Sequence, residues 1–194
     1  GEDLDPWVQW VSVHTGVSSN IHKVYRLGDI PNNTYKQLWE MKELNHLKIG
    51  LWGLMNASKG SSNNCNFFVP DPWTFSENAF PGELKPYLEL ARYTSTNYLN
   101  ISLVKILSLV FNFKKLIVFK NLLTTLIISL FKLILPQLIK YGYKPYIFIS
   151  LFEYIGSLLF LKYTKNTKAD LSILFLNQLA HIQHHYWSDK YEYI

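Results

Sequence analysis

The fold is decided by the apolar run LSILFL, residues Leu171–Leu176, which has polar residues on both sides. A continuous apolar run of this length is typical of a central strand that is covered on both faces of a parallel sheet. Two further runs have strand length, Lys48–Leu54 and Cys65–Val69. We therefore expect an α/β fold in which Ile49–Leu54 and Leu171–Leu176 belong to one parallel sheet, because a crossover connection can carry a long insertion.

Helical periodicity dominates residues 99–166. Apolar side chains recur at helical spacing over Leu103–Phe113, and the pattern continues over Leu122–Leu135 until Pro136 interrupts it. A further helix is expected over about Pro145–Tyr163, because proline suits the first turn of a helix. The organisation that follows is a first part of an α/β core at residues 1–98, a helical insertion at 99–166 and a return to the core at 167–194.

Two shorter helices are expected before the first strand. One covers Pro6–Gly16, where glycine is a common helix C-cap. The other begins after Thr34, a residue type that favours the N-cap position. The apolar side chains that this second helix would bury are Leu38, Trp39, Met41 and Leu44.

Composition excludes two classes of protein. Of the 194 residues, 48% are hydrophobic and 17% are charged, which is the opposite of an intrinsically disordered chain. Cys65 is the only cysteine, so neither an intrachain disulfide nor a multi-cysteine zinc site can form. The chain opens with Gly1 and has no basic and then apolar leader, so no signal peptide is expected and no compartment is assigned.

Positive charge is concentrated in one block. The segment Leu99–Lys168 contains ten lysines and a single acid, Glu153, and no uncharged run within it reaches the ~18–20 residues that span a bilayer. The stretch closest to that length is Tyr146–Leu161, which Glu153 interrupts. Basic amphipathic helices can instead lie on anionic lipid, so a membrane surface contacted through residues 99–166 is one expected partner. No nucleic-acid partner is expected.

A dense polar cluster, Asn177–Trp187, directly follows the decisive apolar run. In open α/β sheets, ligands bind beyond the carboxyl ends of the strands. Asn177, His181 and His185 are spaced four residues apart, so on one helical turn each pair would share a face and could bind a common ion. The alternative is that these are solvated polar residues of an ordinary helix.

The Pro6–Gly16 segment offers a second group of polar residues. Gln9, Ser12 or His14 would serve a functional site, whereas the alternative is a plain core helix. No Ser/His/Asp spacing in the chain is recognisable as a nucleophilic triad.

Several segments share residue types, order and spacing with one known family. These are PWVQWVSVHTG at Pro6–Gly16 with IHKV at Ile21–Val24, GLWG at Gly50–Gly53, FVPDPW at Phe68–Trp73 and NQLAH at Asn177–His181. The first resembles the nucleophile helix of the alkaline phosphatase superfamily, in its type I phosphodiesterase and nucleotide pyrophosphatase branch. IHKV resembles that branch's His-Gly-Val segment.

The resemblance implies an incomplete alkaline-phosphatase-like domain with a mostly parallel sheet and a cap-like helical insertion. It implies a metal-dependent phosphodiesterase, phosphatase or sulfatase-like hydrolase that acts on a small phosphorylated or sulfated ester. Members of that family hold two zinc ions, and a Thr or Ser between them attacks the ester. Asn177 and His181 match the family's Asp-x-x-Gly-His metal motif, so they are the implied zinc ligands.

Three positions depart from the family pattern. Pro6 stands where the nucleophile is expected, Lys23 replaces the glycine after the histidine, and Asn177 replaces an aspartate. Gln9 and Ser12 are the nearest catalytic candidates. The family's first strand and its final Asp-His and His would lie outside these 194 residues, so we expect a fragment that is inactive alone. A catalytically silent relative and a basic membrane-surface binding protein are the alternative functions.

Overall fold

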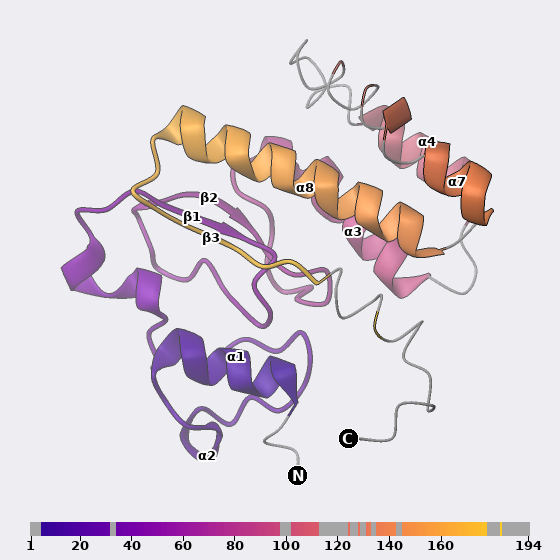
Figure 1. The fold of residues 1–194 in the computed structure, drawn as a ribbon. Helices are drawn as coiled ribbons and strands as arrows, with labels where there is room; N and C mark the ends of the chain where they lie inside the picture. The colour runs from indigo at the N-terminus through magenta and orange to yellow at the C-terminus, as the bar shows by residue number, and fades with distance from the viewer. Residues whose placement is uncertain are drawn as a thin grey trace, which may run out of the picture. The chain divides into compact units, whose positions relative to one another are not determined.

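The computed structural model describes residues 5–31, 34–97, 102–112, 124, 128, 131–132, 135–142, 145–177 and 183. They form an α/β structure with a three-stranded, all-parallel sheet and several helices (Figure 1). The chain divides into two compact units. Unit 1 comprises Gly1–Val118 and Phe160–Phe175, and unit 2 comprises Phe119–Leu159 and Leu176–Ile194.

The sheet of unit 1 contains β1 (Ile49–Trp52), β2 (Cys65–Val69) and β3 (Leu171–Leu174) in the order β2-β1-β3. β1 pairs in parallel with β3, Ile49 opposite Leu171 and Trp52 opposite Leu174, so the prediction that these segments share one parallel sheet is confirmed. Among the described residues, β1 is the central strand and β3 lies at an edge of the sheet, so the prediction of a central strand is wrong for β3, which is half-buried throughout. A continuous apolar run indicates that both faces of a strand are covered. It does not indicate how many strands pair with that strand.

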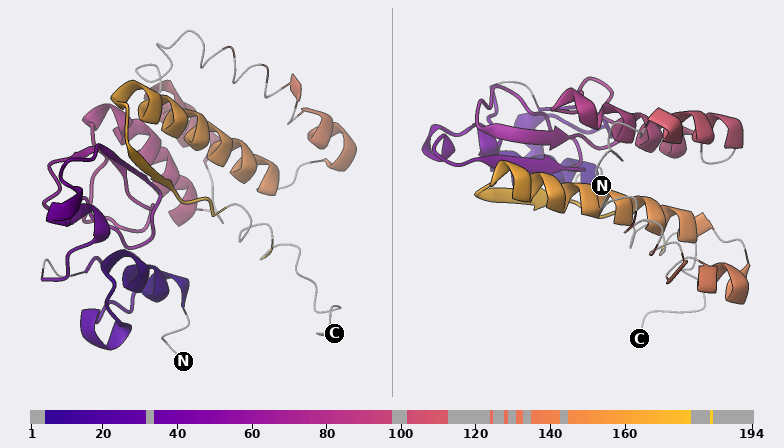
Figure 2. Two further views of the ribbon diagram at one scale, coloured as in Figure 1. Left: turned by 60° about the vertical axis from the view of Figure 1, so that its left-hand side comes forward. Right: turned by 90° about the horizontal axis from the view of Figure 1, so that it is seen from above.

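One face of the sheet packs on helices that lie far apart in the sequence. The Trp52 ring contacts Tyr87 of α3 (Lys85–Thr96) and Phe160 of α8 (Pro145–Thr167), with ring centroids 5.0 and 6.5 Å apart. Figure 2 shows α3 and the end of α8 that leads into β3 side by side over this face. Gly50 of β1 is needed here, because a Cβ atom at this position would lie 2.1 Å from the fully buried Phe67 ring.

The opposite face holds the main hydrophobic cluster. Its buried members are Trp39, Ile49, Leu51, Leu54, Ala57, Cys65 and Phe68. The helix α1 (Pro6–Thr15) lies on this side (Figure 1). The ring of His14 in α1 contacts that of Trp39, with centroids 5.2 Å apart. The sheet of unit 1 is therefore covered on both faces by apolar and aromatic side chains, which is the arrangement that parallel strands require.

Proline and glycine fix several helix ends as the sequence predicts. α1 ends at Gly16, which has the left-handed φ of 68°, and α8 begins at Pro145. α4 (Leu103–Asn112) agrees with the predicted periodicity. Pro136, where the sequence predicts an interruption of the helical pattern, instead lies in the first turn of α7 (Leu135–Tyr141), which continues beyond it. The helix α3 was not predicted, although Pro86 in its first turn and apolar residues at helical spacing were available signals.

The predicted helix after Thr34 is wrong. Two 3₁₀ helices stand there instead, η2 (Leu38–Glu40) and η3 (Lys42–Leu44). The cap is Gln37, which forms a reciprocal capping box with Glu40. Side-chain bonds from Gln37 to the backbone of Ser58 tie this turn to the segment after β1, so tertiary contacts override the helical pattern.

Candidate functional site

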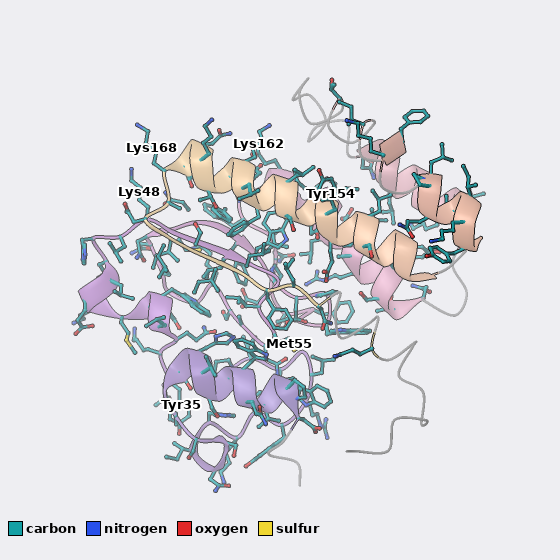
Figure 3. All side chains as sticks on the ribbon, viewed as in Figure 1. Tyr35, Lys48, Met55, Tyr154, Lys162 and Lys168 are labelled. Atoms are coloured by element: carbon teal, nitrogen blue, oxygen red, sulfur yellow. The ribbon has the colours of Figure 1, made fainter. Side chains whose placement is uncertain are left out.

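The candidate site lies at the edge where the parallel strands end. β1 runs on into Gly53–Asn56, β2 into Pro70–Asp71 and β3 into Phe175. α1 reaches this edge, because the Trp10 ring packs edge-on against Phe175 with centroids 5.2 Å apart. Met55, at the end of β1, lies on the side of the sheet that faces α1, whereas Lys48 and Lys168 lie at the opposite edge (Figure 3). The described residues thus bring the first helix together with the ends of the strands, where α/β proteins bind ligands.

Asn56 joins three segments at this edge. It is fully buried and has the left-handed φ of 53°, a conformation that asparagine tolerates better than most residues. Its side-chain oxygen accepts the Gly28 N–H at 2.7 Å, and its amide nitrogen donates to the carbonyls of Arg26 and Trp7 at 2.9 and 3.3 Å. Asn56 therefore fixes the Arg26–Gly28 turn and α1 against the end of β1. No periodicity in the sequence signals this role.

Asp71 performs the corresponding task after β2. Its carboxylate accepts the backbone N–H groups of Asn56, Trp73 and Thr74 at 2.9, 2.8 and 3.1 Å, and it also accepts the Thr74 hydroxyl. Burial raises the pKa of the Asp71 carboxyl, and these hydrogen bonds act against that shift. Because both carboxylate oxygens are already engaged, Asp71 organises the loop and is a poor choice of metal ligand.

Ser12 and His22 form the most suggestive pair of side chains in unit 1. Nε2 of His22 lies 3.0 Å from Oγ of Ser12, and Nδ1 accepts the backbone N–H of Val24 at 3.0 Å. An acceptor Nδ1 requires the neutral tautomer with its proton on Nε2, so His22 donates to Ser12. Burial lowers the pKa of His22, which keeps the ring neutral. In this arrangement His22 holds the hydroxyl in position and does not act as its base.

His14 is the other buried imidazole of α1. Its ring lies 5.7 Å from that of Trp10 and 5.2 Å from that of Trp39, and it forms a hydrogen bond with the backbone of Met55. Burial lowers the pKa of His14 to about 4. Its Nε2 has no hydrogen-bond partner among the described residues. A single neutral imidazole in an aromatic setting fits the expected core helix better than a binding role.

An open depression of about 730 Å³ lies beside His22, within unit 1. One wall comes from His22–Ile30 and the other from Trp73–Ser76. Lys23 is exposed and supplies a positive charge, and Phe75 is 59% exposed and supplies a flat apolar surface. Lys23 also has a left-handed φ of 57°, a conformation that glycine adopts without strain.

The sequence-predicted site residues fall into different places. Ser12 contacts His22 as described, and Gln9 is exposed on α1. Asn177 is half-buried in unit 2, where its backbone N–H donates to Oε1 of Glu153 at 2.7 Å. His181 lies outside the described residues, as does His185. Among the residues that the structure describes, no three His, Cys, Asp or Glu side chains are grouped to hold a metal ion.

Comparison with protein-family models, with curated proteins and with solved structures finds no match to this chain.

Proposed function

We propose that this chain is part of a zinc-dependent hydrolase of small phosphorylated or sulfated esters, of the alkaline phosphatase type. The observation that carries the proposal is the contact between α1 and the strand ends, in which Trp10 packs on Phe175 and Asn56 binds the carbonyl of Trp7. A hydrolase of this type needs its first helix at that edge, because its ligands come from the ends of several strands.

The backbone at Lys23 supports the same proposal. The resemblance sets a glycine at this position, and Lys23 has the left-handed φ of 57° that favours glycine. A replacement of glycine by lysine that kept the left-handed backbone accounts for both the family pattern and the φ of Lys23.

The depression beside His22 has room for such an ester. The Lys23 ammonium would attract a phosphate or sulfate group against the opposing charge of Asp29 in the same depression, and Phe75 would contact an apolar part of the substrate. His22, which holds the Ser12 hydroxyl, lines the depression. His22 supplies no base in the observed tautomer, so activation of a nucleophile has to come from elsewhere.

Zinc would be held through His181 and Asn177. Imidazole suits Zn²⁺ and is already neutral at pH 7, so His181 is the principal ligand. Asn177 offers only a neutral oxygen, although the Glu153 carboxylate that accepts its backbone N–H adds negative charge nearby. A zinc ion held there would supply Lewis-acid chemistry. We expect weak affinity, because the carboxylates that the family uses are not all present in the chain.

Zinc titration of the purified chain, by equilibrium dialysis, tests this proposal. We expect binding that His181→Ala abolishes and that His46→Ala leaves unchanged, since His46 is an exposed histidine of unit 1. Zinc binding that is equally strong in wild type and His181→Ala would overturn the proposal.

A catalytically silent relative is the second candidate. The hydrogen bond from His22 to Ser12, which leaves the hydroxyl without a base, favours it, as does Pro6 in place of the nucleophile. Because the 194 residues are expected to be inactive alone, the two candidates differ in turnover by the full-length parent of bis(4-nitrophenyl) phosphate, 4-nitrophenyl phosphate and 4-nitrophenyl sulfate with zinc present. A parent that binds zinc through His181 and hydrolyses none of these esters would support the silent relative.

A further inference from the structure

Unit 2 exposes a row of large apolar side chains. Ile128, Phe131, Leu135 and Ile139 are 47%, 65%, 43% and 77% exposed, and successive members are three, four and four residues apart. We call these four residues the apolar stripe. Leu135 and Ile139, which are four residues apart in α7, lie on one face of that helix.

The helix α7 contributes the second half of this stripe and has no buried residue. Leu135 and Ile139 are both exposed on it, and so is the neighbouring Tyr141. Single exposed apolar residues are common on soluble proteins, whereas a row at helical spacing marks a surface that binds something.

Lysines accompany the stripe. Lys132 directly follows Phe131 and Lys140 directly follows Ile139, and both are exposed. Nζ of Lys140 lies 4.8 Å from the centre of the Tyr141 ring. From Leu99 to Phe152 the sequence contains no Asp or Glu at all. The stripe therefore lies in a positively charged segment that attracts negatively charged surfaces. The segment contains no acidic residue that would repel such a surface.

Apolar residues on one helical face, flanked by lysines and without acids, fit the boundary between lipid headgroups and acyl chains. We propose that the apolar stripe and its lysines bind the surface of a bilayer that contains anionic phospholipid. The apolar side chains enter the acyl boundary while Lys132 and Lys140 meet the phosphates, since long lysine side chains can reach the headgroups. In the described part of the chain, no helix is long and apolar enough to cross a membrane. The proposal stands apart from the hydrolase, because no residue of the stripe belongs to that site.

Vesicle flotation tests the proposal with the full chain. Two vesicle types are compared, phosphatidylcholine alone and an equal mixture of phosphatidylcholine and phosphatidylglycerol. We expect binding to the mixed vesicles, weaker binding to phosphatidylcholine, and a marked loss at high salt. Failure to float with the mixed vesicles would overturn the proposal.

Matched variants locate the surface. Ile139→Asn should weaken binding about tenfold by removing apolar contact, whereas Val13→Asn, at a position 66% exposed on α1, should leave binding unchanged. Lys132→Gln and Lys140→Gln should each weaken binding about fivefold, which corresponds to ~1 kcal/mol per lysine, and Lys42→Gln should have no effect. These positions are exposed, so the variants are expected to keep their fold.

Two other occupants give different results. If the stripe binds a second copy of the chain, sedimentation shows a dimer that Ile139→Asn dissociates, and the vesicles are not bound. If the lysines bind any polyanion, duplex DNA binds as tightly as the mixed vesicles and Ile139→Asn changes neither affinity. Either result would overturn the proposal.

Discussion

Acid should destabilise unit 1 through His14. Burial lowers the pKa of this ring from 6.5 to about 4, so the unfolded chain takes up the proton at a higher pH than the folded chain does. Stability that is present above pH 6.5 is therefore lost as the pH falls from about 6.5 toward 4. Between about pH 7.5 and about pH 5, the loss from this one ring is about 2 kcal/mol, or roughly 30-fold in the unfolding equilibrium.

Urea unfolding at the two pH values measures this effect, with the fluorescence of Trp10 and Trp39 reporting on the surroundings of His14. His14→Phe keeps an aromatic ring between the two tryptophans and loses the hydrogen bond to Met55, at a cost that does not depend on pH. The variant should lose about 2 kcal/mol less than wild type on acidification. The pKa of His22 is lowered too, but that contribution cancels in the comparison.

The control is His46→Gln, at an exposed histidine. This variant should lose as much stability between the two pH values as wild type does. The reasoning would be refuted if His14→Phe lost as much stability between the two pH values as wild type does.

Three further predictions concern unit 1. Gly50→Ala should destabilise the protein by about 3 kcal/mol in the same urea assay, because the added Cβ meets the buried Phe67 ring. The control Gly16→Ala has open space around the added Cβ and should cost only ~1 kcal/mol, from left-handed backbone strain. Lys23→Gly should raise the free energy of unfolding by ~0.5–1 kcal/mol by relieving its left-handed backbone, and an unchanged midpoint would contradict this. Burial raises the pKa of the Cys65 thiol to about 11, so a thiol reagent should modify Cys65 only in urea, and rapid labelling of the folded chain would count against its burial.

The elements that the sequence predicts correctly are those with strong local signals. Pro145 and Gly16 fix helix ends through backbone constraints that act within one turn. The β2 strand ends before Pro70, which cannot donate a ladder hydrogen bond. β1 and β3 pair in parallel, as expected from the apolar runs Ile49–Leu54 and Leu171–Leu176, which are both buried by joining one sheet.

The elements that the sequence predicts wrongly depend on distant contacts. The turn at η2 is set by Gln37 and its bonds to Ser58, which lies 21 residues further along the chain. The edge position of β3 depends on which strands lie beside it, and its own residues do not encode that.

The candidate site could be predicted only in part. The sequence singles out Asn177 because it follows an expected strand, and it singles out Gln9, Ser12 and His14 as polar residues of the expected Pro6–Gly16 helix. It does not single out Asn56, because the role of Asn56 depends on meeting Gly28, Arg26 and Trp7 in space. The direction of the hydrogen bond between His22 and Ser12 likewise depends on the backbone N–H of Val24, which no spacing reveals.

The zinc affinity of Asn177→Asp tests the central proposal most directly. The substitution restores the carboxylate that the family pattern sets at this position, beside the carboxylate of Glu153, whose Oε1 accepts the N–H of residue 177. Two carboxylates at close range repel each other, and a bound cation relieves that repulsion. Asn45→Asp, at an exposed position of unit 1, is the matched control for the added charge. We expect Asn177→Asp to bind zinc about tenfold more tightly than wild type, and to lose the gain when His181→Ala is added. An affinity no higher than that of Asn45→Asp, or a gain that survives His181→Ala, would contradict the assignment of a zinc site to Asn177 and His181.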